Sequence, residues 1–421
     1  MSFFRYIFFG EKMRTLLLRL LFFIFISLPH PVGAEAYDTI KIYLDVDFSN
    51  ASSSSIAIER GILTALDEVE NKIGRYPVVV VRKNHHGNAR RSKDNLKEYL
   101  TDPQGLAVFA GLHSPPLLAN LEFINKNQVL VLDPWAAAGP ITRYPAKENW
   151  IFRLSVDDSK AGFTIVQHAV EQRGMKRPAL LLEETGWGKS NEKTMGRALR
   201  DRGLAPTGIF WFNWGLRERG ARIILRSIID SQPDSILLVA NAPEAKVICK
   251  ALLSLEQPVK LPVFSHWGLT GGDFPEVIKH AQRQQIDLSF LQTNFSFISN
   301  KESQYGQQVL ARAKKIFPQD IQSAGDIRAP AGFIHAYDLT RIFLAAAQQG
   351  RLSGNIRKDR QMMRKNLESL EKSVQGLIKN YSHPFAPFRD EEPDNHEALG
   401  AEDLTMGRYN KDNQIELLKP R

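Results

Sequence analysis

The feature that most constrains the fold is a regular alternation of short apolar segments with amphipathic segments, which runs from residue 39 to residue 265. The short segments are rich in Val, Ile and Leu, and apolar residues recur at helical spacing between them. This alternation is typical of a mostly parallel sheet whose strands are joined by helices. The expected strands cover residues 39–44, 77–81, 106–111, 129–132, 178–182, 208–212, 234–240 and 263–265.

The expected strands fall into two consecutive series, which meet at residues 151–154. Each series is long enough to form the core of its own lobe. We therefore predict an α/β fold with two Rossmann-like lobes, each built on a parallel sheet and joined by crossover hinge strands. The predicted first lobe combines residues 38–152 with 291–355, and the second combines residues 153–290 with 356–421.

Beyond residue 290 the alternation ends. Residues 294–300 are polar and are expected to be extended. A hairpin is expected near the C-terminus, from residues 404–409 and 414–418. The expected helices of the chain cover residues 56–71, 190–202, 305–316, 330–349 and 358–370, with one more through Leu96 and Leu100 and another through Ile223, Leu225 and Ile228.

The N-terminal 34 residues resemble a secretory signal peptide. Arg14 and Arg19 precede an apolar run over residues 20–28, and the small residues Gly33 and Ala34 follow. We expect cleavage after Ala34 and a mature protein in the periplasm. An uncleaved anchor is the alternative, although the apolar run is shorter than the ~20 residues that span a bilayer.

Cysteine content and charge exclude or disfavour some classes of protein. Cys249 is the only cysteine, so the chain can form no intramolecular disulfide and must depend on a large core. The formal net charge of +9 is spread along the chain without a dense basic block, which disfavours nucleic-acid binding. We expect a monomer.

Neither a metal site nor a cofactor is predicted. The adjacent pair His85 and His86 would point to opposite faces of a strand and has no matching cluster of ligands, so a solvated strand end is expected. Asp45 and Asp47 lack the rest of a calcium-binding loop and are expected to begin an ordinary loop.

The sequence also carries no recognisable catalytic motif. Ser114 is outside a G-x-S-x-G nucleophile elbow. Residues 186–190 lack the first glycine of a phosphate-binding loop, because Glu183 occupies its position. The pair Glu183 and Glu184 has no glycosidase context. We therefore predict no catalytic residues and a protein that is not an enzyme.

Several expected strand ends resemble those of type I periplasmic binding proteins, in particular the leucine/isoleucine/valine-binding branch of ABC transporter substrate-binding proteins. The resemblance extends over most of residues 38–350. Its motifs are the turns at residues 110–114, 132–137, 186–188, 240–244 and 265–268, together with the crossover at residues 152–154.

This resemblance implies a ligand site between the lobes, because open parallel sheets bind ligands beyond the carboxyl ends of their strands. The family holds a ligand carboxylate with hydroxyl and amide donors of the first lobe. The implied ligand-binding residues are His113, Ser114, Trp135, Ala136 and Ala137 in the first lobe, and Trp187, Asn241 and Trp267 in the second.

The sequence departs from the family at the position near Trp267, where amino-acid binders carry an acid for the ligand ammonium. Trp135, Trp187 and Trp267 suggest instead a ligand with a flat or apolar body, or one that carries an acid group. The alternative is that these tryptophans pack the lobes.

The resemblance implies a protein that closes on a small organic ligand and delivers it to a membrane ABC importer. An alternative of another class is a sensory module that docks on a membrane sensor kinase or a diguanylate cyclase, which the tail after His383 suggests. A third alternative is an exported enzyme or assembly factor that has lost ligand binding. Fold alone does not decide between them.

Overall fold

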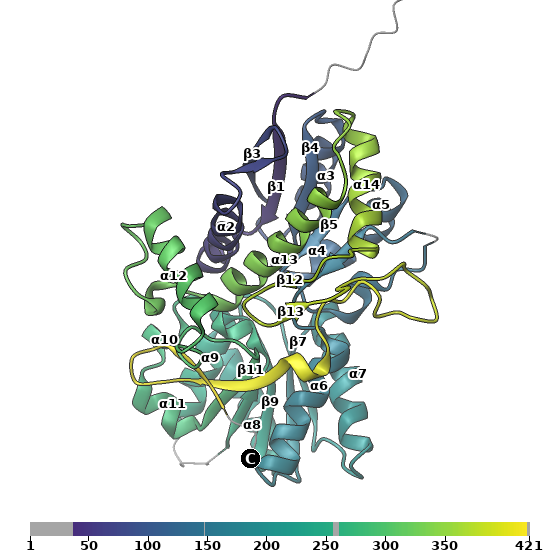
Figure 1. The fold of residues 1–421 in the computed structure, drawn as a ribbon. Coiled ribbons are helices and arrows are strands. Elements are labelled where there is room, and N and C mark those ends of the chain that lie inside the picture. Colours follow the sequence, from purple (N-terminus) through teal and green to yellow (C-terminus); the bar gives the residue numbers. More distant parts are fainter. Residues whose placement is uncertain (1–36, 147, 256–260, 419–421) are drawn as a thin grey trace, which may run out of the picture.

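The computed structural model describes residues 37–146, 148–255 and 261–418, so the predicted signal peptide lies outside the described residues. Two sheets form the cores of two lobes, one above the other in Figure 1. The first sheet has the order β2-β3-β1-β4-β5-β6 and the second the order β15-β14-β11-β10-β9-β7-β8. All neighbours are parallel except β2 with β3, and β14 with β11 and β15. The predicted fold class is confirmed.

The first lobe is built on strands buried by helices. Its elements up to the crossover are β1 (Ile40–Val46), α2 (Ser52–Asp67), β2 (Lys72–Ile73), β3 (Tyr76–Asn84), α3 (Ala89–Thr101), β4 (Gly105–Ala110), α4 (Ser114–Leu118), α5 (Leu121–Lys126), β5 (Val131–Asp133), a short 3-10 turn (Gly139–Thr142) and β6 (Ile151–Arg153). Every residue of β4 is buried, which explains its apolar sequence.

The second lobe repeats the pattern. Its elements are α6 (Asp158–Gln167) with a π-helical end (His168–Gln172), β7 (Pro178–Glu183), α7 (Gly186–Arg200), β8 (Ile209–Phe212), α8 (Glu218–Asp230), β9 (Ser235–Val239), α9 (Ala242–Leu253), β10 (Val263–Ser265), a 3-10 turn (Trp267–Thr270), α10 (Phe274–Val277), α11 (His280–Ile286) and β11 (Leu288–Thr293). Helix α7 begins four residues earlier than expected, because Thr185 caps it by accepting a hydrogen bond from the amide of Gly188.

The rest of the chain contributes elements to both lobes. It forms α12 (Gln304–Ile316), a 3-10 turn (Ala324–Asp326), α13 (Pro330–Gln349), α14 (Ile356–Glu368), β12 (Val374–Gln375), β13 (Asn380–Tyr381), a 3-10 turn (Ala401–Asp403), β14 (Leu404–Tyr409) and β15 (Ile415–Leu417). The predicted hairpin is confirmed, and it extends the second sheet because β14 pairs with β11. Residues 296–300 form a turn instead of an extended segment, closed by the amide of Asn300 on the carbonyl of Ser296 (2.8 Å).

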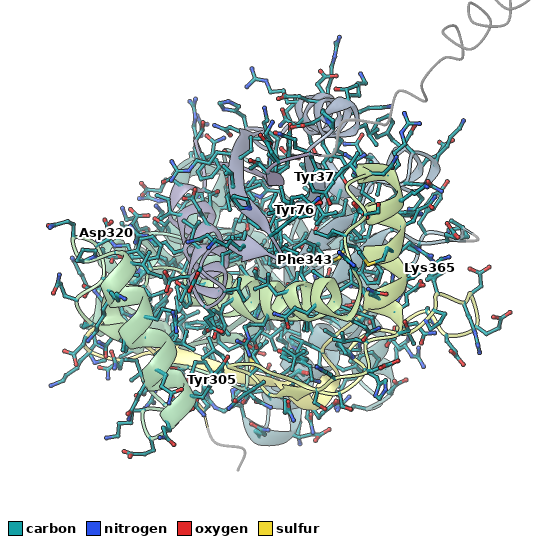
Figure 2. The ribbon with its side chains drawn as sticks, turned by 45° about the horizontal axis from the view of Figure 1, so that its top comes forward. Tyr37, Tyr76, Tyr305, Asp320, Phe343 and Lys365 are labelled. Carbon is teal, nitrogen blue, oxygen red and sulfur yellow. The ribbon has the colours of Figure 1, made fainter. Side chains whose placement is uncertain are left out.

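Helices α13 and α14 both pack on the first lobe (Figure 1). Gly61 of α2 lies so close to α13 that a Cβ there would be 2.3 Å from the carbonyl oxygen of Phe333. Arg360 of α14 donates to the carbonyl of Gly105 (2.7 Å). Tyr37, beside Tyr76 in Figure 2, donates to a carboxylate of α14. The assignment of residues 356–421 to the second lobe is therefore wrong for α14.

Candidate functional site

The loops at the carboxyl ends of both sheets meet between the lobes. In the first lobe they follow β1, β4 and β5, and in the second they follow β7, β8, β9 and β10. A central cavity of about 20 Å³ lies where they meet, and Glu183 and Trp214 also line it. All eight residues that the sequence suggested as ligand-binding line this cavity: His113, Ser114, Trp135, Ala136, Ala137, Trp187, Asn241 and Trp267. That they bind a ligand remains a prediction.

Two tryptophans from opposite lobes close the centre of the site. The rings of Trp135 and Trp267 stack with centroids 4.9 Å apart, and Trp267 also stacks on His335 of α13, again at 4.9 Å. Trp267 is 1% exposed. Burial lowers the pKa of His335 to about 3, so this ring is neutral and packs as an uncharged partner. The stack therefore joins the second lobe to the first.

Trp187 stands in the first turn of α7 and is nearly buried, at 6% exposed. Its ring meets His266 edge to face, with centroids 5.1 Å apart. Within the described part of the chain, its indole Nε1 has no hydrogen-bond partner. A buried N–H that lacks an acceptor lowers the stability of the folded protein. Trp187 also lines the central cavity, where a ligand could supply that acceptor.

A buried pair of side chains holds the loop that carries Trp267. The amide of Trp267 donates to Nδ1 of His266 (3.0 Å), so Nε2 of this ring carries the proton and donates to Asp158 (3.0 Å). Burial raises the pKa of Asp158, while the hydrogen bond from His266 opposes the rise. Asp158 stands in the first turn of α6, so this pair fixes Trp267 against the second lobe.

The loop after β5 uses several of its own amides internally. Asp133 accepts a hydrogen bond from the amide of Ala136 (2.8 Å), and Ser114 Oγ accepts one from the amide of Ala138 (3.2 Å). The resemblance had implied that amides beside Ser114 and at Ala136 and Ala137 hold a ligand carboxylate. The amide of Ala136 is already bonded, so this part of the site offers fewer donors to an anion than the resemblance implied.

Glu183 brings a buried carboxyl group to the central cavity from the end of β7. Asn241 donates to its Oε2 (2.9 Å) and Thr185 to its Oε1 (3.1 Å). Burial raises the pKa of Glu183 to about 7, a hydrogen bond from Trp214 opposes the rise, and the charge of Glu244 adds to it. This carboxyl group can therefore change its charge near neutral pH.

An outer cavity of about 400 Å³ adjoins the central one. The two share six lining residues: Leu112, His113, Trp135, Trp214, Asn241 and Gly268. Trp214 follows β8 in the second lobe, is 43% exposed, and lies over His113 of the first lobe with ring centroids 5.4 Å apart. Trp214 therefore lines both cavities while much of its side chain remains exposed to solvent.

The comparisons with known proteins agree with this geometry. Residues 39–414 match the periplasmic binding protein family. The chain belongs to this family. Among curated proteins, none matches the sequence of this periplasmic binding protein.

Solved structures share the fold at low sequence identity. A type 1 periplasmic binding protein from Bordetella pertussis aligns with a TM-score of 0.75 and 15% identity, over 90% of this chain and 100% of that one. A solute-binding protein of an ABC transporter from R. palustris, in complex with 4-hydroxybenzoate, has a TM-score of 0.72 and 18% identity, over 91% and 96%. LivJ from Streptococcus pneumoniae, in complex with isoleucine, has a TM-score of 0.68 and 18% identity, over 91% and 100%. The predicted type I fold is thereby confirmed.

In this periplasmic binding protein the C-terminal tail completes the hinge. The carbonyl of His396 accepts from the amide of Arg153 in β6 (2.9 Å), and the amide of Ala398 donates to the Arg153 carbonyl (2.9 Å). The buried guanidinium of Arg153 pairs with Glu397 (2.6 Å) and with Asp157 (3.0 Å). The part of the tail at residues 396–398 is therefore fixed to the crossover, and the chain then continues into β14 of the second sheet.

Three further observations bear on the sequence-based expectations. Within the described residues, no three His, Cys, Asp or Glu side chains lie close enough together to hold a metal ion. None of the described helices is both long and apolar enough to cross a bilayer. His85, expected at a solvated strand end, is instead buried, and burial lowers its pKa to about 3.

Sequence reasoning missed four residues of the cleft: Asp47, Glu183, Trp214 and Glu244. Each directly ends or closely follows a strand, at the edge where the resemblance already implied ligand loops. Glu183 had been considered only against phosphate-loop and glycosidase patterns, and Asp47 only against a calcium-binding loop. Their position after strands was the signal that could have identified them.

Proposed function

We propose that this periplasmic binding protein closes its two lobes on a small organic solute and delivers it to a membrane ABC importer. The observation that carries the proposal is that loops from both lobes line one cavity at the carboxyl ends of both sheets. A solute that contacts both lobes stabilises the closed arrangement over the open one, because only the closed arrangement supplies both sets of contacts.

Within this proposal, the first lobe contacts the solute through His113, Ser114 and the loop from Trp135 to Ala137. The second lobe contacts it through Trp187, Asn241 and Trp267. Solved proteins of the same fold hold 4-hydroxybenzoate, benzoate or isoleucine, and several are solute-binding proteins of ABC transporters. These relatives support a small solute and a membrane permease as the partner.

The sensory alternative rested on the unusual tail after His383 and on the missing acidic partner for a ligand ammonium. Much of this tail is engaged within the molecule, through Glu397 at the hinge and through β14 in the second sheet. A tail held in this way supplies no particular reason to prefer a sensor partner. We therefore propose transport alone.

The distance between the lobes tests the proposal. Arg91 on α3 and Arg219 on α8 are both exposed, so Arg91→Cys with Arg219→Cys can carry spin labels in a Cys249→Ala background. A panel of amines, amino acids, organic acids, sugars and purines should contain a solute that shortens this distance. A pair within the first lobe, Arg91→Cys with Lys126→Cys, should keep its distance. An inter-lobe distance that no solute changes would contradict the proposal.

A further inference from the structure

The two cavities of the cleft have an unusual charge for a chain whose formal net charge is +9. Among the described residues that line them there are three carboxylates and no lysine or arginine. The carboxylates are Asp47, Glu183 and Glu244, and four tryptophans stand with them: Trp135, Trp187, Trp214 and Trp267. A cleft with acidic groups and aromatic faces attracts positive charge.

Asp47 already has a set of partners inside the protein. Its carboxylate accepts from the amides of Ser49 (3.0 Å) and Asn50 (2.9 Å), and its Oδ2 lies 3.3 Å from Nε2 of His113. Although burial acts to raise it, these hydrogen bonds hold the pKa of Asp47 well below its ordinary value. Asp47 is therefore ionised, and neighbouring groups already supply hydrogen bonds to its carboxylate.

Glu183 and Glu244 differ, because the partners found for them are neutral. Glu183 accepts from Asn241 and Thr185, and Glu244 accepts from the amide of Gly215 (3.0 Å). In the described part of the chain neither forms an ion pair with a lysine or arginine, and each is buried, although the charge of His113 acts to lower the pKa of Glu183. The two are close enough for Glu244 to raise the pKa of Glu183. Buried carboxylates that repel each other favour a positive group between them.

A second, independent feature points to a ligand. Trp187 lines the central cavity, and its side chain is only 6% exposed. Its Nε1 is buried and has no hydrogen-bond acceptor within the described structure. Ser114 Oγ, in the same cavity, accepts from Ala138 and keeps its own hydroxyl proton for donation. The inner end of the site thus offers donors to an acceptor atom.

We infer that the solute of this cleft is a small organic cation, a protonated or quaternary amine, with a hydrogen-bond acceptor at its inner end. The inference rests on the proposed function and specifies its solute class. The positive nitrogen lies against Glu183 and Glu244 beside the face of Trp214, and the acceptor meets Trp187 and Ser114. An aromatic carboxylate would instead face two buried carboxylates, and the described lining of the two cavities holds no lysine or arginine to offset the repulsion.

Matched solutes test the charge directly. Calorimetric titration at about pH 8 should compare tyramine with tyrosol, its neutral analogue, and choline with its neutral carbon isostere. Benzoate and 4-hydroxybenzoate serve as anions. At least one cation should bind about tenfold or more tightly than its neutral partner, and the two anions should bind more weakly still. Neutral or anionic solutes that bind as tightly as the cations would overturn the inference.

Variants separate this inference from the proposed function. Glu183→Gln and Glu244→Gln keep the side-chain shape and should each reduce the preference for a cation over its neutral partner. Glu184→Gln is the matched control, since Glu184 is exposed and lines neither cavity. If a neutral or anionic solute closes the lobes while both cations fail, the inference is wrong and the proposed function stands. If no solute shortens the inter-lobe distance, both are wrong.

Discussion

The indole ring of Trp135, from the first lobe, stacks on that of Trp267, from the second, with an angle of 26° between the ring planes. Each ring buries the other only while the lobes are together. Contacts of this kind stabilise the closed state without stabilising either lobe alone, so their removal should change ligand affinity more than the stability of the ligand-free protein.

The first prediction concerns Trp267→Ala. Loss of the stack with Trp135 and His335 should weaken solute binding by about 2 kcal/mol, because the closed state loses a large apolar contact between lobes. The unfolding midpoint of the ligand-free protein should change little if that protein is open. Trp187→Ala should behave in the same way. Calorimetric titration and thermal unfolding of the same samples measure the two effects.

Trp150 supplies the contrast for this prediction. It is 1% exposed and lies within the first lobe, away from both cavities. Trp150→Ala should lower the free energy of unfolding by about 3–5 kcal/mol, as expected for a large core residue. If Trp267→Ala lowers the ligand-free stability as much as Trp150→Ala and leaves affinity unchanged, then Trp267 is a core residue and not a ligand contact.

Ser114→Ala tests the hydroxyl at the inner end of the cleft. This variant removes a donor that we propose bonds the solute, and it should weaken binding by about 1–2 kcal/mol. Isothermal titration with the best solute measures the loss. An unchanged dissociation constant would place the solute away from Ser114 and would require another contact for its inner end.

Glu397→Gln tests the hinge. Among the described residues, the change leaves the buried guanidinium of Arg153 with Asp157 as its only ion-pair partner, and it should lower the free energy of unfolding by about 3 kcal/mol or more. Glu391→Gln, in the same tail but exposed and outside this network, is the control. Equal denaturant midpoints for the two variants would show that the tail does not stabilise the hinge.

The raised pKa of Glu183 predicts a pH dependence. Between its ordinary value of 4.5 and its value of about 7 here, the folded protein keeps a proton that the unfolded chain has released. Glu183 therefore lowers stability as pH rises through this range, and its effect levels off above it. Because a bound cation favours the ionised carboxylate, tyramine should bind more tightly as pH rises from about 6 to about 8.

Other groups face Glu183 and must be separated from it in that experiment. Glu244 lies nearby, Thr185 and Asn241 bond its oxygens, and a positive charge on His113 would also weaken cation binding. Glu183→Gln should flatten most of the pH dependence. A profile that is the same in this variant would show that Glu183 does not cause the pH dependence.

The positions of most strands along the chain were predictable from the sequence, because short β-branched and apolar segments between amphipathic ones are typical of parallel sheets. The run at residues 77–81 is β-branched almost throughout, and it became part of β3, although only Val78 of this run is buried and Val79 is exposed. The strand ends then defined the cleft, so all eight suggested residues line one cavity. Position after a strand was a better guide than the identity of each side chain.

What the sequence could not give depended on contacts distant along the chain. Helix α14 joins the first lobe through Arg360 and the carbonyl of Gly105, which are 255 positions apart. The tail reaches the hinge through Glu397 and Arg153, 244 positions apart. The raised pKa of Glu183 depends in part on the charge of Glu244, which belongs to a loop after a different strand. No local pattern encodes such pairs, so their roles emerged only from the packed structure.

Thermal unfolding of residues 35–421, refolded to remove bound solute, tests the central claim most directly. The protein should be compared alone and with each member of a panel of amines, amino acids, aromatic acids, sugars and purines. We predict that at least one solute, and first of all an organic cation, stabilises the protein by about 2.7 kcal/mol at a hundredfold excess over its dissociation constant. A melting temperature that no small solute raises would contradict a cleft built for solute capture.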